Sequence, residues 1–166
     1  MNCKLLRFVM FTLSLLAIPT FANAQVNGSG PSDPALFDTV INLPPEPDIG
    51  DSQSIGGIFG QTTQVNVMDG GSVGTFFDAN SGSEVNISGG AVGVGFDARS
   101  GSVVNISGGA VGGLFDACSG SEVNISGGTV GDAFDALSGS EVNISGGTMG
   151  DDFNACLLYT SPSPRD

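Results

Sequence analysis

The sequence contains no histidine and no tryptophan, and its one tyrosine is Tyr159. It has four basic residues against 17 acidic ones. Lys4 and Arg7 lie near the start and Arg165 near the end, so Arg99 is the only base in between. Enzymes that move protons depend on groups such as histidine, lysine and tyrosine. A repeated acid in every copy of a repeat also does not single out a catalytic pair. We therefore expect no enzyme in this chain.

The scarcity of bases also restricts the partners. The formal net charge is -13 for the chain and -15 for residues 25–156, which hold 16 acids and Arg99. Nucleic-acid binding depends on lysine and arginine that neutralise phosphates, so no nucleic-acid partner is expected. Anionic membrane surfaces are excluded for the same reason. The three cysteines are too few for a disulfide-dense scaffold. The 27 glycines disfavour helices.

What the sequence does contain is a repeat of about nineteen residues. Its copies start at equivalent valines, spaced by 20, 19, 19 and 19 residues: Val65, Val85, Val104, Val123 and Val142. A fixed period near twenty indicates a solenoid whose repeats stack on one another. Apolar and polar residues alternate in Glu122–Ser126, which predicts a half-buried strand. Gly127-Gly128 predicts a turn. Two shorter strands are predicted over Thr129–Gly131 and Ala133–Ala136, and Ser138–Ser140 closes the coil.

We therefore expect an all-β fold, a parallel β-solenoid of about five 19-residue coils over residues 52–155. Stacking places equivalent residues about 4.8 Å apart. It predicts an interior aromatic ladder of Phe77, Phe96, Phe115, Phe134 and Phe153. It predicts an aliphatic ladder beside it, formed by Val85/Ile87, Val104/Ile106, Val123/Ile125 and Val142/Ile144. Ile55–Gly60 resembles the later Ser-Gly-Gly-Thr-Val-Gly segments and is interpreted as part of a partial first coil.

The two ends of the chain differ from the repeat. Residues 1–24 have the basic start, the apolar run and the Ala22-Asn23-Ala24 cleavage site of a secretory signal peptide. A membrane anchor is the alternative, but the run is short for a span. Residues 25–51 are rich in proline, glycine and acids, which predicts a disordered linker. Residues 156–166, CLLYTSPSPRD, resemble the translation of a transposase-type sequencing adaptor. The native protein is then expected to continue beyond them; a native disordered tail is the alternative.

Three polar rows follow from the same stacking. Asparagines form the first, which we interpret as a structural amide ladder or, alternatively, as a sugar-contact surface: Asn66, Asn86, Asn105, Asn124 and Asn143. Aspartates form the second: Asp78, Asp97, Asp116 and Asp135, ending in Asn154. Stacked carboxylates repel one another. They are therefore expected either to bond turn backbone or to hold calcium, which takes six to eight oxygen ligands. No other cofactor is expected. The third row, Glu84, Glu122 and Glu141, is interrupted by Val103 and is interpreted as a solvated face.

The repeat region, Ile55–Ala155 with its Val-Asn-Ile-Ser-Gly-Gly-Thr-Val-Gly motif, resembles bacterial secreted or cell-surface β-solenoid proteins of the adhesin and autotransporter-passenger kind. The resemblance implies an extracellular structural or adhesive rod. Its partners are then extracellular glycans or cell-surface components. A carbohydrate- or calcium-binding surface is the second hypothesis. A fragment of a polysaccharide-degrading β-helix enzyme is the third, although such lyases need a basic group that this chain supplies only as Arg99.

Overall fold

The computed structural model describes residues 37–45, 47–57 and 61–156, and all of their regular secondary structure is β-strand. The described residues belong to one compact unit that begins at Phe37. The predicted signal peptide, residues 25–36 of the predicted linker and residues 157–166 of the tail lie outside the described residues. No helix in the described ranges is long and apolar enough to cross a membrane.

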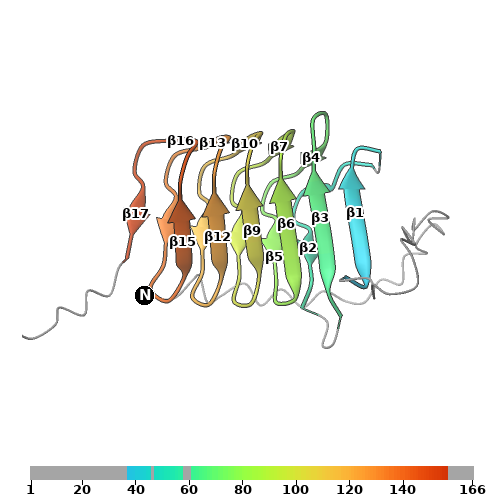
Figure 1. Ribbon diagram of the computed structural model, residues 1–166, viewed down its shortest axis with the longest axis horizontal. Helices are drawn as coiled ribbons and strands as arrows, with labels where there is room; N and C mark the ends of the chain where they lie inside the picture. The colour runs from blue at the N-terminus through green and yellow to red at the C-terminus, as the bar shows by residue number, and fades with distance from the viewer. Residues whose placement is uncertain (1–36, 46, 58–60, 157–166) are drawn as a thin grey trace, which may run out of the picture. The chain divides into compact units, whose positions relative to one another are not determined.

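The strands form three parallel sheets, and each sheet takes one strand from successive coils (Figure 1). Sheet 1 contains the longest strands: β1 (Thr39–Leu43), β3 (Thr63–Val67), β6 (Ser83–Ile87), β9 (Val103–Ile106), β12 (Glu122–Ile125) and β15 (Glu141–Ile144). Sheet 2 contains β4 (Ser72–Val73), β7 (Ala91–Val92), β10 (Ala110–Val111), β13 (Thr129–Val130) and β16 (Thr148–Met149). Sheet 3 contains β2 (Ser54–Ile55), β5 (Asp78–Ala79), β8 (Asp97–Ala98), β11 (Asp116–Ala117), β14 (Asp135–Ala136) and β17 (Asn154–Ala155).

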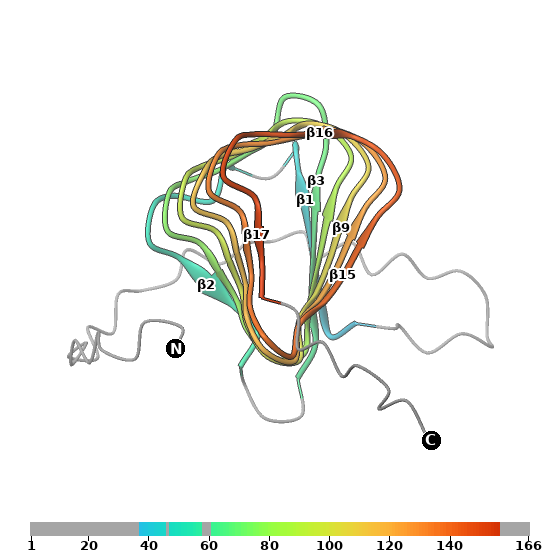
Figure 2. The same cartoon turned by 90° about the vertical axis from the view of Figure 1, so that its left-hand side faces the viewer.

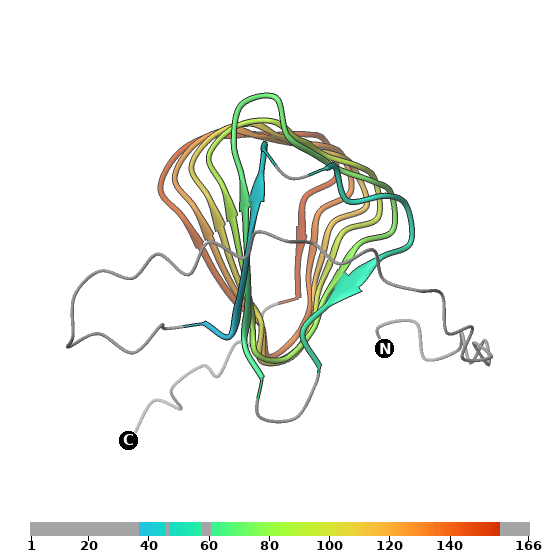
Figure 3. The same cartoon turned by 90° about the vertical axis from the view of Figure 1, so that its right-hand side faces the viewer.

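Viewed along the stack, each coil is a three-sided loop with one sheet on each side (Figures 2 and 3). Every pairing is parallel and in register, so that Val123 lies beside Val104 and Val142. The predicted parallel β-solenoid with 19-residue spacing is therefore confirmed. The 20-residue spacing between Val65 and Val85 arises between β3 and β4, because Thr63 pairs with Ser83 twenty residues later and Ser72 pairs with Ala91 nineteen residues later.

The coil shape follows from local sequence. In β12, Val123 and Ile125 point inward and are at most 1% exposed, whereas Asn124 between them faces outward. The Ser-Gly-Ser corner needs its glycine, because Gly120 has a φ of +80° that other residues rarely adopt. Its second serine closes the turn: the Ser121 hydroxyl donates to the Cys118 carbonyl at 2.7 Å. The predicted turn at Ser138–Ser140 is formed in the same way.

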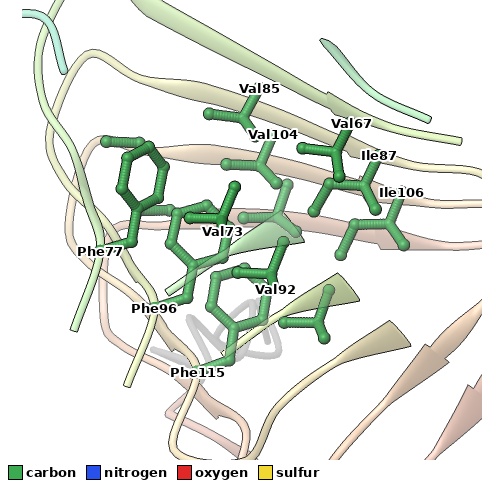
Figure 4. Packing of buried hydrophobic residues seen from close by; sticks show 14 of the residues in the cluster. Val67, Val73, Phe77, Val85, Ile87, Val92, Phe96, Val104, Ile106 and Phe115 are labelled. Atoms are coloured by element: carbon green, nitrogen blue, oxygen red, sulfur yellow. The ribbon is translucent and has the colours of Figure 1, made fainter. Parts of the chain in front are cut away.

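The core is the stack of inward-facing side chains (Figure 4). Each inner coil contributes two aliphatic residues from sheet 1, a valine from sheet 2, and a phenylalanine and an alanine from the third side. The predicted aromatic ladder is present, with neighbouring ring centroids 4.7–5.5 Å apart. Phe77, Phe96 and Phe115 are 0% exposed, whereas Phe153 in the last described coil is 42% exposed. Burial of this apolar surface is the main stabilising contribution.

Two expectations about the N-terminal boundary are wrong. The predicted linker, residues 25–51, includes β1 and Ile49, which pair with the next coil 24 residues later. The solenoid therefore includes Thr39–Leu43 and does not begin at residue 52. Ile55 was matched to the Ser-Gly-Gly-Thr-Val-Gly segment, but β2 pairs with β5, so Ile55 lies beside Ala79. The alternation of Thr39–Leu43 favours the strand, and no proline lies within it.

Candidate functional site

The aspartate row lies on the outer face of sheet 3. Asp78, Asp97, Asp116 and Asp135 occupy equivalent positions in four successive coils and pair in register, with Asn154 next in line. All four aspartates are partly exposed, since the strand alternation turns the following alanine inward. The structure thus brings the predicted metal-ligand candidates together in one line, about one strand spacing apart.

Arg99 compensates part of this negative charge. Its Nη2 donates to Asp78 Oδ1 at 2.9 Å and to Asp97 Oδ2 at 3.1 Å. The arginine side chain is 40% exposed and the two aspartates are 33% and 25% exposed, so water screens the pair. The only base of residues 25–156 therefore forms ion pairs within the solenoid. At Asp78 and Asp97 the arginine, and not a calcium ion, offsets the repulsion between the stacked carboxylates.

A metal centre is not preassembled in the described ranges, where no three His, Cys, Asp or Glu side chains converge. A linear row offers one carboxylate per coil. Calcium requires six to eight oxygens, so an ion between Asp116 and Asp135 would need amide, hydroxyl, carbonyl or water oxygens as well. Calcium binding by the aspartate row stays a prediction.

The asparagine row forms a continuous amide ladder on the outer face of sheet 1. Each Nδ2 donates to the Oδ1 of the preceding asparagine at 2.8–3.1 Å, through Asn42, Asn66, Asn86, Asn105, Asn124 and Asn143. In Asn66, Asn86, Asn124 and Asn143 the same Nδ2 also donates to a side chain two residues earlier, for example from Asn86 to Glu84 at 2.8 Å. Because these amides donate hydrogen bonds to one another, the structural interpretation of the row is favoured over sugar contact.

The glutamate row supports that ladder. Glu84, Glu122 and Glu141 each accept a hydrogen bond from the asparagine of the same strand, and Gln64 takes this role in β3. The interpretation as a merely solvated face therefore missed a structural role. At Val103 the acceptor is absent. Beside the row, a shallow groove of about 530 Å³ runs across three Gly-Ser turns and is bordered by Glu122 and Glu141.

Aspartates of the first coil accept backbone hydrogen bonds from the second coil. Asp38 Oδ2 accepts from the Thr62 N–H at 2.7 Å, Asp48 Oδ1 from the Ser72 N–H at 2.8 Å, and Asp51 Oδ1 from the Thr75 N–H at 2.7 Å. Hydrogen bonds from the Thr75 backbone and side chain lower the pKa of Asp51. These acids were assigned to a linker and a terminal repeat, and only their 24-residue register identifies their role.

Sequence reasoning thus found the rows but not all of their partners. Register follows from periodicity, so the aspartate, asparagine and glutamate rows were all predictable. The bridging position of Arg99 depends on its rotamer and on the coil before it. The roles of Asp38, Asp48 and Asp51 depend on a coil whose sequence differs from the repeat. Neither carried a recognisable signal.

The chain matches no protein-family model, no curated protein and no solved structure. Its function must therefore be argued from the geometry of its own residues.

Proposed function

We propose that this chain is an extracellular structural or adhesive rod of the bacterial cell surface. The observation that carries the proposal is the uniform register of the coils, in which identical residues form continuous ladders both inside and outside. Each coil rests on its neighbours alone, and such an array makes a stiff shaft whose length grows with the number of coils.

The polar surface agrees with this role. The asparagine ladder and the glutamates beside it bind one another, and Arg99 binds two aspartates. Polar groups that pair in this way stabilise the shaft and leave few directed donors or acceptors for a substrate. A strongly acidic surface also favours solubility outside the cell.

Export can be tested by expressing the full chain in a bacterium and determining the N-terminal sequence of the recovered protein. Removal of the predicted signal peptide gives Gln25 as the first residue of material in the medium or on the cell surface. A chain that keeps Met1 and stays in the cytoplasm contradicts the proposal. A glycan array separates the two versions, since a purely structural rod binds none of the sugars and an adhesive one binds a subset.

Calcium binding by the aspartate row is the second candidate, favoured by the register of Asp116 with Asp135. The test compares the melting temperature of the full chain in calcium and in chelator. A calcium site predicts stabilisation that disappears in an Asp116→Asn/Asp135→Asn variant. The matched control is Glu122→Gln/Glu141→Gln, which removes two equally spaced acids from sheet 1. An equal response of both variants indicates general charge screening instead of a site.

A further inference from the structure

Four residues connect sheet 2 to sheet 3 in each repeat coil, and we call the middle two of them the corner pair. A glycine precedes each pair. The pairs are Asp51-Ser52, Thr75-Phe76, Val94-Gly95, Gly113-Leu114, Asp132-Ala133 and Asp151-Asp152. From the second coil onward a phenylalanine of the interior ladder follows each pair. The flanking residues are therefore nearly identical from coil to coil, whereas the corner pairs differ in size, polarity and charge.

The backbone of the corner is the same in every coil. The second residue of all six pairs has a φ between +55° and +78°. In this conformation the N–H of the second residue donates to the following coil: the Phe76 N–H donates to the Val94 carbonyl at 2.8 Å, and the Leu114 N–H to the Asp132 carbonyl at 2.9 Å. This conformation favours glycine and is unfavourable for a bulky side chain.

Bulky side chains nevertheless stand at this corner, exposed to solvent. Phe76 is 57% exposed, Leu114 is 56% exposed and Val94 is 42% exposed. We call these three residues the corner ridge. Gly95 has a buried backbone beneath it, and a Cβ added there would lie 2.7 Å from Phe76 Cδ1, so the phenylalanine ring covers this glycine. Phe76 and Leu114 thus occupy strained positions in which each residue stays more than half exposed.

Negative charge lies at both ends of the corner ridge along the stack and on its sheet 3 side. Asp51 precedes it along the stack, and Asp132, Asp151 and Asp152 follow it, all of them exposed. The aspartate row of sheet 3 runs parallel to it, two residues after the second residue of each pair. Arg99, the only base of residues 25–156, is held by Asp78 and Asp97. The surface is therefore apolar at its centre and acidic at its two ends, where Asp51 precedes it and Asp132, Asp151 and Asp152 follow it.

We propose that the corner ridge is a docking surface for an extended peptide segment whose apolar residues are followed by lysine or arginine. Backbone strain at an exposed bulky residue persists where it serves a function. The aspartates that follow the ridge along the stack favour lysine or arginine in the part of the peptide that follows its apolar residues. Phe76 and Leu114 are two coils, about 10 Å, apart. An extended segment advances about 3.3 Å per residue, so six or seven residues reach from Phe76 to the acidic corner pairs.

The test measures binding of the full chain to a fluorescein-labelled peptide, Leu-Phe-Leu-Ser-Lys-Lys-Lys, by fluorescence anisotropy at low salt. The expected result is saturable binding that weakens as salt rises. A peptide with glutamate in place of lysine, and one with serine in place of the apolar residues, should each bind at least about tenfold more weakly. Equal binding of the lysine peptide and the serine-substituted peptide overturns the proposal, since it indicates charge attraction alone.

The decisive variant is Phe76→Gly/Leu114→Gly. Glycine relieves the strained φ, so the variant should melt at a higher temperature than the parent chain and lose at least about tenfold in peptide affinity. Asp132→Asn/Asp151→Asn/Asp152→Asn should reduce both affinity and salt dependence, while asparagine at 132 keeps the acceptor for the Asp151 N–H. Met68→Ser, at an exposed apolar residue of another corner, should leave binding unchanged. A lower melting temperature of the glycine variant, or unchanged affinity, overturns the proposal.

Discussion

Phe96 and Phe115 stack with their ring centroids 4.9 Å apart and their planes 5° from parallel. Phe115 and Phe134 continue the stack at 4.7 Å and 9°. These separations match the spacing of paired strands, about 4.8 Å. The backbone ladder therefore sets the ring geometry, and removal of an inner ring takes one stacking neighbour from the ring on each side of it.

Replacing Phe115 by alanine should destabilise the chain by about 3–5 kcal/mol, because the cavity lies between two rings that the strands hold in place. Urea unfolding measures the loss. Phe153→Ala is the matched control. The ring centroids of Phe153 and Phe134 are 5.1 Å apart, but Phe153 is 42% exposed, so its replacement should lower the unfolding free energy clearly less than Phe115→Ala does. Equal losses at the two positions contradict a stack that is buried in its middle coils.

Gly112→Ala should destabilise the chain by about 1–3 kcal/mol through steric overlap. An added Cβ would lie 2.7 Å from the Gly93 carbonyl carbon and from the Val94 nitrogen, which are backbone atoms of the preceding coil. Gly50→Ala is the control, since nothing lies within 4 Å of a Cβ there. Thermal unfolding of both variants checks the comparison, and a neutral Gly112→Ala would mean that the coils can separate without loss.

Val103→Gln should stabilise the chain by about 0.5–1.5 kcal/mol by completing the polar network of sheet 1. Gln64 provides the pattern: it accepts from Asn66 Nδ2 at 3.3 Å and donates to Glu84 at 3.1 Å. A glutamine at 103 offers Asn105 the acceptor that valine lacks.

The control for that change is Val103→Glu, which offers the same acceptor but adds a carboxylate between Glu84 and Glu122. Its unfolding free energy should therefore fall below that of Val103→Gln at low salt and approach it at high salt. If both variants behave alike, the hydrogen bond to Asn105 is not what matters at this position.

Arg99→Gln should lower stability by less than about 1 kcal/mol, because the ion pairs are partly exposed. The deficit arises because Asp78 and Asp97, which lie one coil apart, lose the positive charge of Arg99 between them. Denaturant titrations at low and high salt measure it, and the deficit should shrink as salt rises. The triple variant with Asp78→Asn and Asp97→Asn should recover the loss; failure to recover it would assign the effect to lost packing of the arginine stem.

Acid should weaken the contact between the first two coils. The pKa of Asp51 in the folded chain lies below its ordinary value of 3.8 because Thr75 donates hydrogen bonds to the carboxylate. Its contribution to stability is therefore complete above that ordinary value and is lost as the pH falls through the folded pKa. Hydrogen exchange of the Thr75 amide below pH 4 should become faster in the parent chain. In the Asp51→Asn variant, the exchange rate of the Thr75 amide should vary with pH only as intrinsic exchange does.

The periodicity of the sequence was sufficient to determine the sheets, the ladders and the three polar rows. In a parallel stack of equal coils, residues one period apart must become neighbours, whatever the details of each turn. The aspartate and asparagine rows, and the ladder from Phe77 to Phe153, follow from that single relation.

The tertiary structure alone decided the rest. It placed Thr39–Leu43 and Asp51 in a first coil whose 24-residue spacing differs from the repeat, and it brought Arg99 onto two aspartates. It also showed that Phe76 and Leu114 occupy strained, exposed positions. The repeat period does not predict these features, because each occurs where the sequence of one coil differs from that of the others. Their structure depends on contacts between that coil and its neighbours.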